Sequence, residues 1–352
     1  LVDLDRDGDL DLTAATRHQV VWIENMGAPS RSHNWLVHEI ASKPTIDARS
    51  FELSPADVNN DGQPDIVACD ARATHPGAPK RLGWYENTHV VPSGDQIQFV
   101  GLDITTDLVG AWGVGIADLN GDGRLDVAAA GYGNNDAQGR TEWWRSAPGD
   151  PLVWTRVYTA TFDKGRGVAT YRDPTTGRSY PWYLVSSEDL GGRLQQFAAA
   201  NGDWTQPLPY TILTGLGETY HAAAADLNDD GTYDLLATSR SNDDLVWGQS
   251  LTTTWVHAQA TIDADCDGAR GVCAGDFDGD GDLDIAAACQ YEQKLHWWQN
   301  VSDGAVWAAK TISVSFPGAT DVRCGDINGD GLDEIVDVHA VAYGARGTER
   351  DP

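Results

Sequence analysis

A nine-residue acidic pattern with glycine at its sixth position occurs six times along this chain, and it limits the fold more than any other feature. The copies are DLDRDGDLD at 3–11, DVNNDGQPD at 57–65, DLNGDGRLD at 118–126, DLNDDGTYD at 226–234, DFDGDGDLD at 276–284 and DINGDGLDE at 326–334. Most neighbouring copies start about 50 to 60 residues apart. A regular period in this range is typical of repeat proteins, in which each repeat is one supersecondary unit.

The interval between the third and fourth copies is about twice as long, which predicts a degenerate repeat near residue 170. Gly165–Tyr171 is similar in sequence to Gly268–Ala274, and Asp173–Gly177 then turns the chain without the acidic pattern. The sequence therefore predicts seven repeats. The fourth lacks the acidic pattern and is not expected to bind a metal ion.

Small and aromatic residues alternate within each repeat. Small residues crowd the segment before the acidic turn, as in Gly113–Ala117, and tryptophans follow in a constant phase, as at Trp22, Trp84 and Trp247. Four short strands per repeat, small at one end and aromatic at the other, fit a propeller blade whose inner strand lies at a narrow axis. We predict an all-β, seven-bladed β-propeller of four-stranded antiparallel blades, with most tryptophans packed between blades.

The predicted domain organisation is a single propeller spanning 1–352. Its blades lie near 1–45, 46–105, 106–160, 161–213, 214–262, 263–313 and 314–352. The terminal blades read as incomplete, and the chain opens on Leu1 without a start methionine. We therefore expect a fragment of a longer protein, with open terminal blades that need a partner.

The acidic turns have the composition of calcium sites. Oxygen ligands in a flexible turn, without His or Cys, suit Ca²⁺ better than zinc, and the glycine permits a sharp turn. An EF-hand is excluded because position 12 is never Glu and the flanking segments are not helical. We expect about six Ca²⁺ ions and a loss of stability on chelation. The predicted ligands, with main-chain carbonyls at position 7, are Asp3, Asp5, Asp7, Asp9, Asp11, Asp57, Asn59, Asp61, Gln63, Asp65, Asp118, Asn120, Asp122, Arg124, Asp126, Asp226, Asn228, Asp230, Thr232, Asp234, Asp276, Asp278, Asp280, Asp282, Asp284, Asp326, Asn328, Asp330, Leu332 and Glu334.

These turns resemble the calcium-binding FG-GAP or VCBS repeats, known from integrin α-subunit propellers, fungal lectins and propellers attached to polysaccharide lyases. The resemblance covers nearly the whole chain, with Glu334 in place of Asp at the last ligand position. It implies an extracellular or cell-surface location, where millimolar calcium keeps weak sites filled. The sequon Asn300-Val301-Ser302 predicts N-glycosylation at Asn300.

Charge and cysteine content narrow the possible functions. The formal net charge of −29 excludes a nucleic-acid binder, which needs a basic face. No apolar run is long enough for a membrane span. The five cysteines are too few for a disulfide scaffold, and two pairings stay open, Cys266 with Cys273 or Cys273 with Cys324.

The preferred function is a non-enzymatic binding or adhesion module for a glycan or an extracellular protein. Several aromatic residues lie off the repeated tryptophan positions, and three arginines share one phase at the starts of inner strands, where they would line one rim of the axis. Salt bridges between blades would also account for these arginines. The aromatic candidates are Trp112, Tyr132, Trp182 and Tyr220, and the arginines are Arg49, Arg166 and Arg270.

Two other functions compete with the binding module. A structural subunit or head of a surface filament or matrix would use open terminal blades for self-assembly. A polysaccharide lyase-like enzyme would need an active site built from loops, since the chain has neither HExxH nor GxSxG, and no catalytic residue is assigned.

Overall fold

The computed structural model is all-β in its described part. It describes residues 1–15, 19–27, 35–42, 52–70, 81–88, 97–133, 138–147, 150–162, 164–172, 182–188, 191–199, 204–251, 257–313 and 318–336. Within these ranges there is no helix long and apolar enough to cross a membrane.

Twenty-five strands make up the described structure. They are β1 (Leu12–Ala15), β2 (Gln19–Asn25), β3 (Trp35–Ser42), β4 (Leu53–Ala56), β5 (Asp65–Asp70), β6 (Arg81–Asn87), β7 (Phe99–Thr105), β8 (Ala111–Ala117), β9 (Asp126–Gly131), β10 (Gly139–Ala147), β11 (Asp150–Phe162), β12 (Gly165–Arg172), β13 (Trp182–Glu188), β14 (Arg193–Ala198), β15 (Leu208–Leu213), β16 (Thr219–Ala225), β17 (Asp234–Ser239), β18 (Asp244–Ser250), β19 (His257–Asp263), β20 (Ala269–Gly275), β21 (Asp284–Cys289), β22 (Lys294–Asn300), β23 (Trp307–Ser313), β24 (Arg323–Gly325) and β25 (Glu334–Val336).

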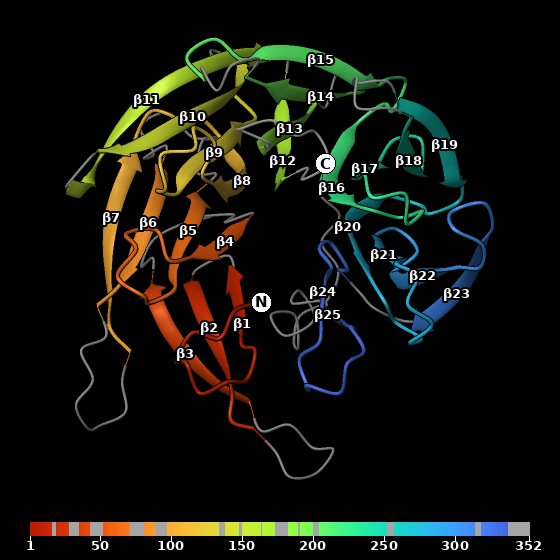
Figure 1. The fold of residues 1–352 in the computed structure, drawn as a ribbon, viewed down its shortest axis with the longest axis horizontal. Coiled ribbons are helices and arrows are strands. Elements are labelled where there is room, and N and C mark those ends of the chain that lie inside the picture. Colours follow the sequence, from red (N-terminus) through yellow and green to blue (C-terminus); the bar gives the residue numbers. More distant parts are fainter. Residues whose placement is uncertain are drawn as a thin grey trace.

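The strands form antiparallel sheets around a common axis, which confirms a β-propeller (Figure 1). Five sheets have four strands in sequence order, β4–β7, β8–β11, β12–β15, β16–β19 and β20–β23. The predicted count of seven four-stranded blades is therefore wrong, and the structure has five. The count was based on turn motifs, and a turn motif does not guarantee four strands around it.

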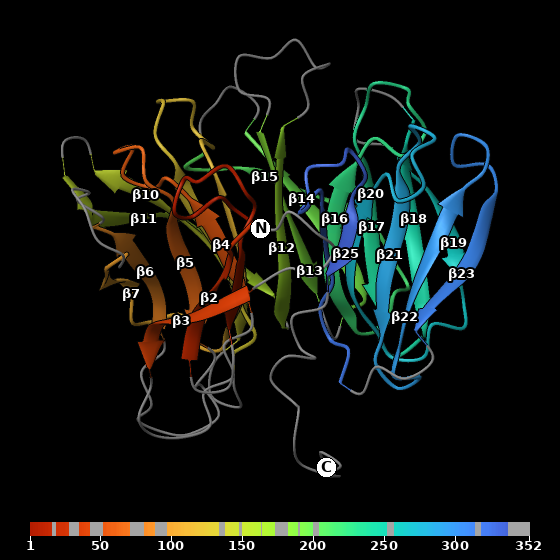
Figure 2. The ribbon, with the colours of Figure 1, turned by 90° about the horizontal axis from the view of Figure 1, so that it is seen from below.

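Two smaller sheets come from the first and last parts of the described chain. One has the order β1-β2-β3, to which the bridge between Val2 and Asp11 adds one more pair of residues, and the other consists of β24 and β25. These two sheets are neighbours in space, as the hydrogen bond from the Asn25 side-chain amide to the Ile327 carbonyl at 3.3 Å shows. Figure 2 shows β12 between the sheets of the first third of the chain and those of the last third.

The strands nearest the axis are rich in small residues because the backbones of neighbouring sheets approach closely there. A Cβ atom on Gly113 of β8 would lie 2.2 Å from the Arg166 carbonyl oxygen of β12. A Cβ atom on Gly271 of β20 would lie 2.6 Å from the Val322 nitrogen. The predicted placement of the small-residue strands at the axis is thus confirmed, and the reason is steric.

Second and third strands fill the space between sheets. Every residue of β9, β17 and β21 is buried, since neighbouring sheets cover these strands on both faces. Tryptophans of one sheet meet those of the next at ring-centroid distances of 6.3 Å for Trp84 and Trp154, and 6.1 Å for Trp247 and Trp307. These pairs confirm the predicted inter-blade packing.

Two disulfides link four of the five cysteines. Cys273 and Cys324 join the inner strands β20 and β24 with Cα atoms 5.9 Å apart, which confirms one of the two open pairings. Cys266 pairs with Cys289, not with Cys273, and this bond fixes the start of β20 to the end of β21. Disulfides form in oxidising compartments, so these bonds are compatible with a secreted or surface protein.

Candidate calcium loops and a candidate ligand-binding site

The six acidic turns, here called the acidic loops, follow the first strand of their repeats and share one backbone conformation. The glycine at position 6 has a positive φ in every copy, between 82° and 102°, which other residues rarely adopt. For Gly8, Gly123, Gly281 and Gly331 a Cβ atom would meet nothing within 4 Å, so the backbone conformation, not space, requires glycine.

The same hydrogen bonds recur in all six acidic loops. The backbone N–H of position 6 donates to the side chain of position 1 at 2.8 to 3.1 Å. The N–H of position 5 donates to the side chain of position 3 at 2.8 to 3.3 Å. The N–H of position 7 donates to position 5 at 2.8 to 3.1 Å. The loop backbone thereby orients three oxygen-bearing side chains in the same way in each copy.

The carboxylate at position 9 is fully buried where it is an aspartate, and it ties the loop to the sheet. In the first loop, Asp11 accepts the Leu4 N–H at 3.0 Å and the Asn25 N–H of β2 at 2.8 Å. In the fifth loop, Asp284 accepts from Phe277 at 3.3 Å and from Asn300 at 2.7 Å. Loss of this carboxylate would leave buried backbone N–H groups without acceptors.

The donor atoms of these loops fit a hard divalent cation. Oxygens of Asp3, Asp5 and Asp11 lie within 4.8 Å of one another, as do those of Asp276, Asp278 and Asp284. The other four loops have Asn at position 3, which offers an amide oxygen in place of a carboxylate. In the described structure, Asp3 Oδ1 is buried and accepts no hydrogen bond. All donors are oxygens, as calcium prefers.

Electrostatics within the loops also favour a bound cation. Burial, together with the neighbouring charges of Asp122 and Asp118, raises the pKa of Asp126 to about 8. Burial likewise raises the pKa of Asp65 and of Asp5 to about 7. A carboxylate that is buried among other carboxylates is stabilised by added positive charge, which a proton or a metal ion can provide.

A third group of metal-ligand residue types, Cys289, Glu292 and His296, has a different explanation. The Cys289 sulfur is bonded to Cys266, and Glu292 already pairs with Lys294 at 2.7 Å. We do not assign a metal site there.

Five of the seven predicted ligand-binding residues come together at one end of the axis. Trp112, Arg166, Tyr220 and Arg270 each occupy the second position of an inner strand, in β8, β12, β16 and β20. Arg49 and the side chain of Trp182 lie outside the described residues. Tyr132 and Lys164, which follow β9 and precede β12, complete the group. We call these six residues the arginine–aromatic cluster: Trp112, Tyr132, Lys164, Arg166, Tyr220 and Arg270.

Within the cluster, cations stack on aromatic rings. The guanidinium carbon of Arg166, which is 6% exposed, lies 4.7 Å from the Trp112 ring centroid, 4.8 Å from that of Tyr132 and 4.6 Å from that of Tyr220. Arg270 lies 4.6 Å from the Tyr220 ring centroid and donates to the Tyr220 hydroxyl at 2.9 Å. The Lys164 ammonium lies 4.0 Å from the Tyr132 ring centroid. Such contacts hold positive charge at low solvation.

Sequence reasoning missed three cations or aromatics near this end of the axis. They are Lys164, Arg240 and Tyr291, and the Arg240 guanidinium lies 5.4 Å from the Tyr291 ring centroid. A signal was present, since residues that follow second strands lie at the same end of the sheet as the starts of antiparallel inner strands.

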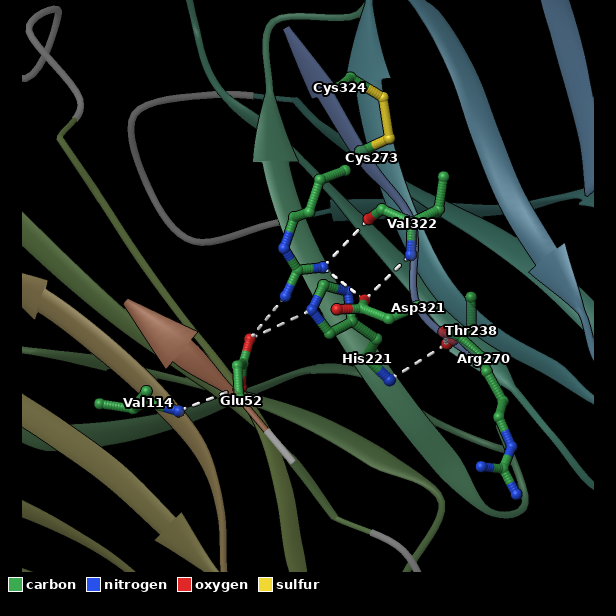
Figure 3. Close-up of polar contacts among 10 residues, drawn as sticks. Glu52, Val114, His221, Thr238, Arg270, Cys273, Asp321, Val322 and Cys324 are labelled. Carbon is green, nitrogen blue, oxygen red and sulfur yellow. Dashed lines mark hydrogen bonds and ion pairs between the residues drawn. A yellow bond between two sulfur atoms is a disulfide. The ribbon is translucent and has the colours of Figure 1, made fainter. Parts of the chain in front are cut away.

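A separate polar network crosses the axis and uses different charges (Figure 3). Glu52 accepts the Val114 N–H at 3.0 Å and lies 3.4 Å from His221 Nε2. The same carboxylate pairs with Arg323 at 3.2 Å, and Arg323 also pairs with Asp321 at 2.5 Å. Arg323 thus has two carboxylate partners within the protein.

The structure contradicts the predicted glycosylation of Asn300. Its side chain is 1% exposed, and Nδ2 donates to the Leu227 carbonyl at 2.8 Å and to the Leu283 carbonyl at 3.3 Å. A glycan on this nitrogen would replace one of its two hydrogens, and therefore remove one of these hydrogen bonds, and would not fit in the buried site. The sequon is instead part of the contact between two sheets.

Comparison with known families identifies the repeat. The family model described as FG-GAP-like repeat matches residues 3–68, 226–287 and 276–336, which together cover half of the chain. The chain belongs to the FG-GAP-like repeat family. Each FG-GAP-like match begins at position 1 of an acidic loop and ends in the strand that directly follows the next acidic loop. No curated protein matched the chain.

Proposed function

We propose that this FG-GAP-like propeller is a non-catalytic, calcium-stabilised module that binds a glycan or protein ligand outside the cell. An FG-GAP-like propeller fold suggests a binding or structural module, and the finer statement rests on one observation. All six acidic loops repeat the same hydrogen bonds from backbone N–H groups to the oxygens at positions 1, 3 and 5. This arrangement gathers oxygens around one point in each loop.

Calcium in this proposal stabilises the scaffold and takes no part in any reaction. Bound in an acidic loop, it would hold the side chains of positions 1, 3, 5 and 9 together and lower their mutual repulsion. Since position 9 also bonds to backbone N–H groups, order in the loop would extend to the strands on both sides.

Direct measurement of bound calcium tests the metal part of the proposal. The protein is stripped of metal with a chelator, dialysed and titrated with Ca²⁺ in a calorimeter. We expect about six sites per chain, and weaker binding of Mg²⁺, which requires a stricter octahedral geometry. Binding of no calcium, or of one ion only, would contradict it.

The alternative function, a structural subunit that self-assembles into a filament or matrix, is tested with the same protein. Light scattering and negative-stain imaging in calcium and after chelation measure particle size. Discrete particles of monomer size support the binding module, whereas long regular assemblies in calcium would replace it with the structural role.

A further inference from the structure

We propose that the arginine–aromatic cluster binds an anionic polysaccharide, through carboxylate or sulfate groups carried on its sugar rings. This inference rests on the proposed binding function and names the ligand class and the site. Three observations carry it: the distance between the cluster and the acidic loops, the lack of acidic partners for two of the cations among the described residues, and the mixture of cations with partly exposed rings.

The six acidic loops lie at the opposite end of the inner strands from the arginine–aromatic cluster. In β16, Tyr220 is the second residue, and the acidic loop begins at Asp226, directly after the last residue. At about 3.3 Å per residue the two ends are about 20 Å apart. At that distance, about two Debye lengths at physiological salt, the acidic loops hardly weaken the attraction of an anion to the cluster. Acidic residues such as Glu218 and Asp243 also lie at the end that holds the cluster, so the attraction of an anion depends on which of the cations there are already paired.

Two cations of the cluster have no acidic partner in the described part of the chain. Arg270 donates to the Tyr220 hydroxyl, and no salt bridge joins Arg270 or Lys164 to a carboxylate among the described residues. Arg323, which lies on the next inner strand, has two carboxylate partners, Glu52 and Asp321. Arg240, at the edge of the cluster, pairs with Glu218 at 3.0 Å. Among the described residues these neighbouring cations are paired with carboxylates, whereas Arg270 and Lys164 are not, and we assign Arg270 and Lys164 to an external anion.

The aromatic rings indicate a sugar polymer in preference to a simple anion. Trp112 and Tyr132 are partly buried and stand 5.7 Å apart between their ring centroids, next to Lys164 and Arg166. Flat apolar rings pack against the C–H faces of pyranose rings, while guanidinium and ammonium groups bind the attached anions. Cations and rings alternate along β8, β12, β16 and β20, as sugar rings and charges alternate along an acidic polysaccharide.

The structure continues this alternation beyond the cluster. Arg240 donates to the Tyr291 hydroxyl, and the Tyr291 side chain is 52% exposed. These two residues follow β17 and β21, and therefore lie at the same end of the sheets as Tyr220 and Arg270. The surface available to a polymer thus extends over four neighbouring sheets.

The test uses the full chain in calcium and three probes in a calorimeter. Hyaluronan oligosaccharides carry carboxylates, dextran sulfate carries sulfates, and dextran is neutral. We expect at least one anionic probe to bind, with affinity that falls as salt is raised, and dextran not to bind. Whichever anionic probe binds identifies the source of the charge. Failure of both, or equal binding of dextran, would overturn the inference.

Variants locate the site. We expect R270Q and K164Q each to weaken binding about tenfold, since a hydrogen bond to a charged group is lost. R270K should retain part of the affinity. The matched control is R145Q, which removes the same charge from an exposed position on β10 and should bind as the parent does. A melting temperature within about 2 °C of the parent shows that the fold is intact, and K164Q serves if R270Q does not fold. Equal affinity of all variants would overturn the site.

Three further outcomes separate this inference from the proposed function. Equal binding of poly-L-glutamate would overturn the sugar class, because that polymer has the charge without the rings. Binding of a neutral glycan alone would overturn the anionic class and leave the binding module standing. If the chain bound no calcium but still bound the anionic probes, the calcium part of the proposed function would fail and the anionic ligand class would stand.

Discussion

The two ends of the inner strands differ in how closely their residues repeat from sheet to sheet. At one end, six acidic loops repeat the same residues, the same backbone conformation and the same hydrogen bonds. At the other end, the equivalent position differs from strand to strand, being Trp112, Arg166, Tyr220 and Arg270 in four successive sheets. The repeated end is suited to a property that every repeat shares, namely stability. The varied end forms one non-repeating surface, which is what recognition of a particular ligand requires.

The largest effect should come from removing calcium, which acts only on the repeated end. At a free calcium concentration about 100 times the dissociation constant, each site contributes about 2.7 kcal/mol to the free energy of unfolding. We therefore expect a chelator to lower the melting temperature by on the order of 10 °C, measured by calorimetry with magnesium as the control. Hydrogen exchange should speed up in the acidic loops before it does in β14 and β15. An unchanged melting temperature would show that calcium in the acidic loops does not stabilise the fold.

Protonation should partly replace calcium in the stripped protein. Burial raises the pKa of Asp126 to about 8 and that of Asp65 to about 7, both above the ordinary value of 3.8. The folded state therefore binds more protons than the unfolded state between pH 4 and pH 8, so stability falls as pH rises through this window. From pH 8 to pH 6 we expect the melting temperature of calcium-free protein to rise by about 5 °C.

The calcium-loaded protein is the control for this pH series. Bound calcium needs deprotonated carboxylates, so its stability should fall as pH is lowered through the same window. Parallel pH dependences with and without calcium would show that the loops do not exchange protons for metal.

A single loop can be broken at position 9 and compared with position 7. D284N should cost about 2 kcal/mol, because an amide nitrogen would face the N–H of Phe277 or of Asn300, both of which Asp284 now accepts. D282N, two residues earlier, keeps the main-chain carbonyl that is its predicted ligand and should unfold like the parent. Chemical denaturation in calcium measures the difference. Equal stability of the two variants would argue against the loop assignment.

A glycine substitution tests the close backbone approach at the varied end of the inner strands. G113A would place a Cβ atom 2.2 Å from the Arg166 carbonyl oxygen and should destabilise the fold by about 1 to 3 kcal/mol. The control is G115A, whose new Cβ would meet the Thr170 side chain at 2.9 Å, an atom that can move. Thermal unfolding ranks the two. If G115A were the less stable variant, close backbone approach would not be what positions Trp112 beside Arg166.

The sequence predicted the parts of this molecule that depend on neighbours along the chain. The period of the acidic pattern predicted strands and loops, and glycine at position 6 predicted the turn, which has a positive φ in all six copies. The phase of Arg49, Arg166 and Arg270 predicted a common rim, because equivalent positions of repeated strands lie at the same height. The structure places Arg166 and Arg270 there, and Trp112 and Tyr220 occupy the same position of their strands.

The parts that the sequence could not predict depend on packing between distant segments. The sequon at Asn300 says nothing of burial, and Cys289 becomes the partner of Cys266 only through the pairing of β20 with β21. Lys164 joins the cluster through its contact with Tyr132, which no pattern encodes. The number of complete blades likewise depends on which strands pair.

The Glu52–Arg323 ion pair also bears on how a ring can be closed. These residues are 271 positions apart, whereas the disulfide between Cys273 and Cys324 spans 51 positions. For a flexible chain the entropy of loop closure grows only with the logarithm of length, so the longer closure costs about 1.5 kcal/mol more than the shorter one. A single charged hydrogen bond is worth about as much. Joining the start of β4 to the last inner strand, β24, therefore needs little more than joining two neighbours, and side chains at the axis can do it without a covalent bond.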